Sequence, residues 1–200
     1  MTANRLPKIP TFVDLYFDVI SPYAWIGFEG ILQYKEKLEE KNVIIRLKPF
    51  FLGGILNLSG NISPIMVPAK AKYMEKDLKM VTKYWGLKFD MNPKFSTETI
   101  IQQTLLPQRF LTAVEQHFPD YLIPSAREFW KRIWETHQTI HTETDLKEVA
   151  KTFKSGAFGA PWFIIRKNGE PSHCFWGSDR IHIILNECGV DFIGPLKSKI

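Results

Sequence analysis

The chain has 200 residues, of which 44% are apolar and 24% charged, and its formal net charge is +5. This composition excludes collagen-like, disordered and solenoid proteins, and the length predicts one compact domain with room for an insertion. The positive charge raises the question of a nucleic-acid partner. However, Lys72, Lys76, Lys79 and Lys83 have helical spacing opposite an apolar stripe, as on a solvated helix face, and no zinc-ligand or helix-turn-helix pattern accompanies them. We therefore expect neither a nucleic-acid partner nor a metal site.

The cysteine content and the hydropathy pattern constrain the environment of the protein. Cys174 and Cys188 are the two cysteines, too few for a disulfide framework, and they favour a reducing compartment. The first ten residues lack the pattern of a signal or transit peptide, and no apolar stretch approaches the roughly 18 residues that a membrane span needs. We expect neither secretion by this route nor a membrane span.

The first third of the chain predicts a strand, a helix and a second strand. Apolar and polar residues alternate over 12–19, which is typical of a strand. Ser21 is a favoured N-cap and Pro22 a favoured first helical residue, so a helix is expected over 22–40. Alternation resumes over 42–50. Elements of these lengths form a right-handed βαβ unit with parallel strands.

The remaining patterns are helical and then return to sheet. The expected helices in the middle of the chain are 69–85, 97–105, 108–117, 124–138 and 143–153, with a break at Pro107. The expected later elements are a strand at 162–166, a turn at Asn168-Gly169, a strand at 172–176 and a helix at 179–187 that ends before Gly189. The order βαβ, helical block, ββα predicts an α/β, thioredoxin-like fold in which 1–63 and 155–200 form one domain and 64–154 an inserted helical domain.

Ser21 occupies the turn where a thioredoxin-like fold places an attacking thiolate, at the positive end of a helix. A serine cannot attack as a thiolate does, so two interpretations remain open. Ser21 is a plain N-cap, or its hydroxyl donates a hydrogen bond to a thiolate that a bound ligand supplies. Such a bond contributes about 1.5–3 kcal/mol, which together with the helix dipole lowers a thiol pKa by roughly one to two units.

Two further segments carry groups that suit a peptide ligand. Pro161 directly precedes a predicted strand, which indicates either a strand-start position or a cis bond that turns the Ala160 backbone toward an extended ligand. Ser178 and Asp179 open the last predicted helix. They are either a plain helix cap or a site for the carboxylate and ammonium groups of an α-amino acid.

Taken together, these segments resemble the kappa class of glutathione transferases. The matching segments, in order, are 21–25 (Ser-Pro-Tyr-Ala-Trp), 59–61 (Ser-Gly-Asn) with 68–70 (Pro-Ala-Lys) and 73–74 (Tyr-Met), 109–114 (Arg-Phe-Leu-Thr-Ala-Val), 156–161 (Gly-Ala-Phe-Gly-Ala-Pro) and 175–180 (Phe-Trp-Gly-Ser-Asp-Arg). The family departs from this chain at Ala24, where it often has serine. The stretch between Trp134 and Gly156 is also shorter than is usual, so the helical insert is expected to be small.

The resemblance implies a DsbA-like thioredoxin fold, a homodimer, and an enzyme that conjugates glutathione to electrophiles or reduces peroxides. Glutathione is then the co-substrate, and Ser21 stabilises its thiolate. The implied glutathione-binding residues are Ser21, Pro22, Tyr23, Asn61, Lys70, Tyr73, Ala160, Pro161, Ser178 and Asp179. Among them, Ala160 would pair with the cysteinyl backbone, Ser178 and Asp179 would hold the γ-glutamyl end, and Lys70 would meet the glycine carboxylate.

Two alternative functions stay open at this point. The chain also resembles bacterial 2-hydroxychromene-2-carboxylate isomerases, which share the serine and the dependence on glutathione. A non-catalytic glutathione or peptide binder is the alternative from a different class. The final residues Ser198-Lys199-Ile200 are one conservative change from the Ser-Lys-Leu peroxisomal signal, so a peroxisomal location is expected, with the mitochondrion as the alternative.

Overall fold

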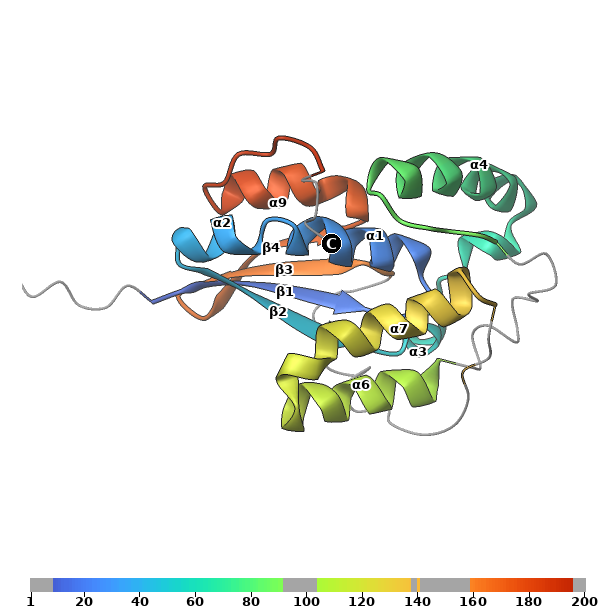
Figure 1. Ribbon diagram of the computed structural model, residues 1–200, viewed down its shortest axis with the longest axis horizontal. Coiled ribbons are helices and arrows are strands. Elements are labelled where there is room, and N and C mark those ends of the chain that lie inside the picture. The colour runs from blue at the N-terminus through green and yellow to red at the C-terminus, as the bar shows by residue number, and fades with distance from the viewer. Residues whose placement is uncertain (1–8, 92–103, 138–139, 141–158, 196–200) are drawn as a thin grey trace, which may run out of the picture.

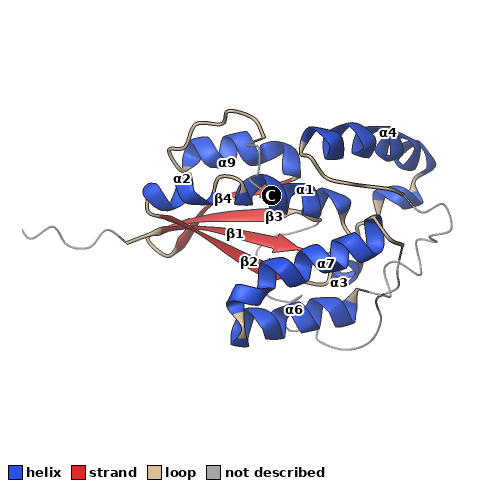
Figure 2. Cartoon of the chain, viewed as in Figure 1, coloured by secondary structure: helices blue, strands red, loops and turns tan. Residues whose placement is uncertain are grey.

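A four-stranded mixed sheet forms the centre of the protein. The computed structural model describes residues 9–91, 104–137, 140 and 159–195, and the statements below concern those residues. The strands are β1 (Thr11–Phe17), β2 (Val43–Pro49), β3 (Trp162–Lys167) and β4 (Glu170–Trp176), in the order β2-β1-β3-β4. β1 runs parallel to β2 and antiparallel to β3, and β4 runs antiparallel to β3 (Figure 2). This arrangement confirms the predicted thioredoxin-like fold.

Helices surround the sheet. They are α1 (Pro22–Leu32), α2 (Lys35–Glu40), α3 (Leu52–Ser59), α4 (Pro68–Tyr84), α6 (Leu105–His117), α7 (Leu122–Trp134) and α9 (Ile181–Glu187), with short 3₁₀ turns η1 (Pro64–Met66), η2 (Pro119–Tyr121) and η3 (Ser178–Arg180). Figure 1 shows α4 and the pair α6–α7 on different sides of α1. Within the described ranges, none of these helices has the length and apolar content needed to cross a bilayer.

The predicted helix over 22–40 is wrong in one respect, because it divides into α1 and α2 at Gln33 and Tyr34. The Tyr34 ring is fully buried, and its hydroxyl pairs with the Gly194 carbonyl and the Ile193 N–H of the C-terminal segment. The bend thus lets an aromatic residue fasten that segment to the core. Sequence periodicity carries no signal of a partner 160 residues away.

The predicted break at Pro107 is also wrong. α6 begins at Leu105, so Pro107 lies in its first turn, where the backbone N–H has no intrahelical partner and proline is tolerated. α3 was not predicted, because Gly53 and Gly54 disfavour a helix. The predicted helices over 97–105 and 143–153 lie largely or wholly outside the described residues. At the β3–β4 hairpin, Asn168 and Gly169 both have positive φ, as the predicted two-residue turn requires.

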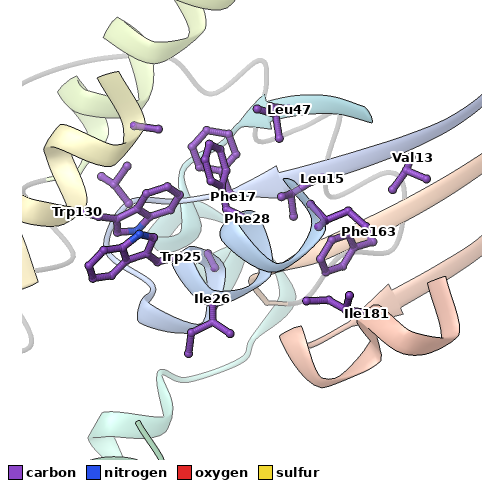
Figure 3. Close-up of a cluster of buried hydrophobic side chains, with 14 of the residues drawn as sticks. Val13, Leu15, Phe17, Trp25, Ile26, Phe28, Leu47, Trp130, Phe163 and Ile181 are labelled. Atoms are coloured by element: carbon purple, nitrogen blue, oxygen red, sulfur yellow. The ribbon is translucent and has the colours of Figure 1, made fainter. Parts of the chain in front are cut away.

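The core joins the sheet to α1 and α7 (Figure 3). Val13, Leu15 and Phe17 of β1 are completely buried beneath α1. From α7, Trp130 stacks on Trp25 with ring centroids 6.2 Å apart and packs edge-on against Phe28 at 4.9 Å. Since Trp25 lies one helical turn after Ser21, this aromatic cluster fixes α7 against the helix whose start carries the predicted site.

Candidate functional site

A cleft of about 1000 Å³ lies where the start of α1, the length of α4, η3 and the turn before β3 meet. The predicted site residues that line it are Ser21, Pro22, Tyr23, Asn61, Lys70, Tyr73, Ala160, Ser178 and Asp179. The exception is Pro161, whose ring packs against α1: a Cβ placed on Gly27 would lie 3.1 Å from its Cγ. The fold therefore brings together residues that are up to 158 positions apart in sequence.

Ser21 is the N-cap of α1. Its Oγ accepts a 3.1 Å hydrogen bond from the Ala24 N–H, and its own N–H donates to the Asp18 carbonyl at 3.0 Å. Because the cap uses the hydroxyl oxygen as an acceptor, the hydroxyl hydrogen stays available as a donor. The side chain is largely buried but lines the cleft. The capping and donor interpretations of Ser21 are therefore compatible, and the partial positive charge at the helix start favours an anion beside it.

The Ala160-Pro161 peptide bond is cis, as the sequence interpretation favoured. Ala160 lines the cleft, and the Pro161 carbonyl accepts a 3.2 Å hydrogen bond from the Gly177 N–H. This bond joins the turn before β3 to the segment that leads into η3. The backbone of Ala160 and the side chains of η3 consequently share one wall of the cleft.

Ser178 and Asp179 lie in η3, so α9 begins at Ile181, two residues later than predicted. Ser178 is buried at the edge of the cleft, whereas Asp179 is exposed and accepts a 2.7 Å hydrogen bond from the Arg180 guanidinium. Gly177 has φ of 99°, and a Cβ there would clash with the Asp179 carboxylate. The glycine therefore permits the close approach that directs the Asp179 carboxylate.

α4 and the segment before it contribute Asn61, Lys70 and Tyr73 to the cleft, and all three side chains are exposed. Asp77 also lines the cleft, and sequence reasoning did not include it in the site. It accepts a 2.7 Å hydrogen bond from the Tyr23 hydroxyl of α1 and a weaker one, 3.4 Å long, from Tyr73. Burial, followed by the bond to Asp77, raises the pKa of Tyr23, which keeps its proton at physiological pH.

Asp18 is a second residue to which sequence reasoning gave no role. Its carboxylate is completely buried beneath the Ser21 turn and accepts hydrogen bonds from four neutral donors. These donors are the Ile20 N–H at 3.0 Å, the Leu52 N–H at 2.8 Å, Thr104 Oγ1 at 3.2 Å and Gln108 Nε2 at 3.0 Å. Burial raises the pKa of Asp18 to about 6, although the hydrogen bonds act in the opposite direction.

Neither cysteine belongs to the cleft. Cys174 lies exposed on β4, and Cys188 is buried at the C-terminal end of α9, where burial raises its pKa to about 11. A sulfur nucleophile at Ser21 therefore has to come from a ligand. Within the described ranges, no group of three or more His, Cys, Asp or Glu side chains is arranged to hold a metal ion.

Comparisons of this chain with known proteins agree on one family. The DSBA-like thioredoxin domain matches residues 12–153. Glutathione S-transferase kappa 1 of Caenorhabditis elegans is 33% identical to this chain, and the alignment covers 90% of this chain and 91% of the relative. Glutathione S-transferase kappa 1 of Homo sapiens is 28% identical, and the alignment covers 94% of this chain and 95% of the relative. The solved structure of a 2-hydroxychromene-2-carboxylate isomerase superposes with a TM-score of 0.64 and covers 89% of this chain and 94% of the isomerase chain. Its sequence is 14% identical, so this similarity concerns the fold alone. The chain therefore belongs to the DSBA-like thioredoxin family and, within it, to the kappa class of glutathione S-transferases.

Proposed function

We propose that this protein is a glutathione transferase that conjugates the glutathione thiolate to small electrophiles, and that Ser21 stabilises this thiolate. The observation that carries the proposal is the Ser21 hydroxyl, which stands at the start of α1 in a cleft without a cysteine. Its oxygen accepts from the Ala24 N–H, so its hydrogen is available to a sulfur anion. The kappa-class relatives carry the same activity in their names.

The cleft offers complementary groups to each part of the tripeptide. In the proposed complex, the Ala160 backbone pairs with the cysteinyl residue, and Ser178 and Asp179 hold the γ-glutamyl end. Lys70 binds the glycine carboxylate, with Asn61 and Tyr73 beside it. The support is that all these residues line one cleft together with Ser21.

A hydrogen bond to a charged acceptor contributes about 1.5–3 kcal/mol, and each pKa unit corresponds to about 1.4 kcal/mol. One bond from Ser21 and the field of α1 thus lower the thiol pKa by roughly one to two units. That change turns a few per cent of thiolate at neutral pH into a large fraction.

The electrophile is proposed to occupy the apolar part of the same cleft. Met74, Leu78, Val81 and Trp85 line it along α4, and Trp134 adds a ring from α7. Apolar walls around a thiolate suit small organic electrophiles. Reduction of peroxides by the same thiolate is proposed as an additional activity, and detoxification as the general role.

A homodimer is the proposed assembly. Large apolar side chains that are more than half exposed lie on η1 and α4 outside the cleft, and association would cover them: Met66 and Met80. Light scattering of the purified protein measures the assembly.

The peroxisomal location, with the mitochondrion as the alternative, stays a prediction, since residues 198–200 lie outside the described part of the chain. Masking the C-terminus with a fused tag tests it.

Calorimetric titration with glutathione, combined with an assay of conjugation to chlorodinitrobenzene, tests the activity. The proposal expects saturable binding and a conjugation rate above the uncatalysed background. Binding without any rate above background, for this and other electrophiles and peroxides, would instead identify a glutathione binder. Absence of both would refute the proposal.

A further inference from the structure

Asp18 connects three elements directly behind the Ser21 turn. Its Oδ1 accepts from the Ile20 N–H of that turn and from Gln108 of α6. Its Oδ2 accepts from the Leu52 N–H at the start of α3 and from Thr104, the residue before α6. α3 contributes Leu52 and Leu56 to the cleft, so this carboxylate holds part of the cleft wall against the turn that carries Ser21.

The charge of Asp18 has no cationic partner among these contacts. All four donors are neutral groups, and the side chain is fully buried. Asp14, four residues earlier on β1, is different: it is equally buried but pairs with Arg46 and Arg166. An ionised Asp18 thus leaves a negative field inside the protein, close to the backbone of Ser21, to which its own carbonyl is hydrogen-bonded.

We propose that Asp18 is a positioning residue that sets the pH range of conjugation: it fixes α3 and α6 against the Ser21 turn, and its ionisation opposes the ionisation of a thiol bound at Ser21. The inference rests on the proposed function, since it needs a glutathione thiolate at that serine. Two negative charges in one buried region disfavour each other, so the protonation states of Asp18 and of the thiol are linked.

Other charged or titratable groups line the same cleft. They are Tyr23 on α1, Lys70, Tyr73, Asp77 and Tyr84 on α4, and Asp179, Arg180 and His182 on η3 and α9. None of them is among the hydrogen-bonding partners of Asp18. A variant that removes the Asp18 charge leaves this set in place, so its effect on the thiol isolates the contribution of Asp18.

The test compares Asp18→Asn with the unaltered protein. The pKa of bound glutathione is read from the ultraviolet absorbance of the thiolate and from the acidic limb of the kcat/KM profile. With the charge removed, both are expected to move to lower pH by about one unit. S-methylglutathione, which has no ionisable thiol, measures any general damage to the site. The expected loss in its affinity is less than about threefold, well below the tenfold equivalent of one pKa unit.

Two further variants keep the inference testable. Gln108→Leu removes one donor to the carboxylate, which favours protonated Asp18, and it is expected to shift the acidic limb in the same direction by a smaller amount. If Asp18→Asn does not fold, this variant supplies the measurement. Asp14→Asn is the matched control. It removes an equally buried carboxylate from β1, just before Asp18, and the charge of that carboxylate is already compensated by Arg46 and Arg166, so the acidic limb should stay in place.

The outcomes separate the two proposals. An acidic limb that stays fixed in Asp18→Asn and Gln108→Leu, or one that moves to higher pH, overturns the role of Asp18. If instead the unaltered protein binds glutathione without lowering its thiol pKa, and Ser21→Ala changes nothing, the proposed function of Ser21 fails first.

Discussion

The Tyr23 hydroxyl on α1 donates a 2.7 Å hydrogen bond to the Asp77 carboxylate on α4. Along α4, Leu78 and Thr82 are the buried residues, and Met74 and Val81 pack against the core with part of their surface exposed. The bond between Tyr23 and Asp77 therefore holds the α4 wall of the cleft at a set distance from Ser21. Lys70, a proposed glutathione-binding residue, lies on the same helix.

Replacement of Tyr23 by Phe is expected to weaken glutathione binding about tenfold. The change removes a hydrogen bond to a charged acceptor, worth about 1.5–3 kcal/mol, while it keeps the ring. Part of the lost interaction free energy lowers the stability of the fold, and part lowers glutathione affinity because α4 is positioned less well. Calorimetric titration of glutathione gives the affinity directly.

A double-mutant cycle with Asp77→Asn separates this bond from other effects. If the bond acts as proposed, the double variant loses less glutathione-binding free energy than the two single variants lose together, with a coupling energy of about 1–2 kcal/mol. The same cycle with Tyr73→Phe in place of Tyr23→Phe is the comparison, because the Tyr73 hydroxyl lies 3.4 Å from Asp77 in an exposed position and its coupling to Asp77 should be small. Additive losses would contradict the linkage between Tyr23 and Asp77.

Local sequence signals predicted most of the sheet and the cap at Ser21, because alternation and capping depend on neighbouring residues. The sequence alone did not assign roles to Asp18 or Asp77. Each meets partners from distant elements: Gln108 lies 90 residues from Asp18, and Tyr23 lies 54 residues from Asp77. A carboxylate on an alternating strand is ordinarily expected to face solvent, and only the packing of α3 and α6 reveals that Asp18 is enclosed.

Ser21→Ala is expected to lower conjugation at neutral pH by about 10- to 150-fold, the equivalent of 1.5–3 kcal/mol. The deficit should shrink at alkaline pH, where the glutathione thiol ionises without help. Ser21→Thr retains both the hydroxyl and the cap and should keep most of the activity. A pH–rate profile of Ser21→Ala that matches the unaltered protein would exclude a role in thiolate stabilisation.

Asp179→Asn is expected to reduce the affinity for glutathione at least tenfold, because the variant lacks the charge that would meet the γ-glutamyl ammonium group. Arg180 already pairs with this carboxylate at 2.7 Å, so Arg180→Ala should leave the affinity unchanged or increase it. Deaminoglutathione, which lacks the ammonium group, distinguishes the roles. Its affinity should not differ between Asp179→Asn and the unaltered protein, and an equal loss for both ligands would argue for general damage.

The stability of the protein should depend on pH through Asp18. Burial raises its pKa to about 6 in the folded chain, against an ordinary value of 3.8. The folded state therefore binds this proton more tightly than the unfolded state does. The resulting stabilisation is complete below about pH 4 and is lost as pH rises through about 6. The difference corresponds to about 3 kcal/mol.

Denaturant unfolding of the unaltered protein and of Asp18→Asn between pH 4 and 8 measures this contribution. Groups other than Asp18 titrate in both proteins and cancel in the comparison. Relative to the variant, the unaltered protein should lose stability between about pH 4 and 6 and then remain constant. A difference that does not vary with pH would show that Asp18 titrates as it does in the unfolded chain.

Trp130→Ala is expected to cost about 3–5 kcal/mol of the free energy of unfolding, since it empties a fully buried site. The ring packs on Trp25 and Phe28 of α1, and its loss frees α7 from the helix that begins at Ser21. Trp130→Phe should cost less, because the indole Nε1 has no hydrogen-bond partner in the described part of the chain.

Phe118→Ala, at a ring that is 63% exposed, is the control and should change stability by under about 0.5 kcal/mol. The midpoints of denaturant unfolding rank the three variants, and a Trp130→Ala midpoint close to that of Phe118→Ala would contradict the anchoring of α7 by this cluster.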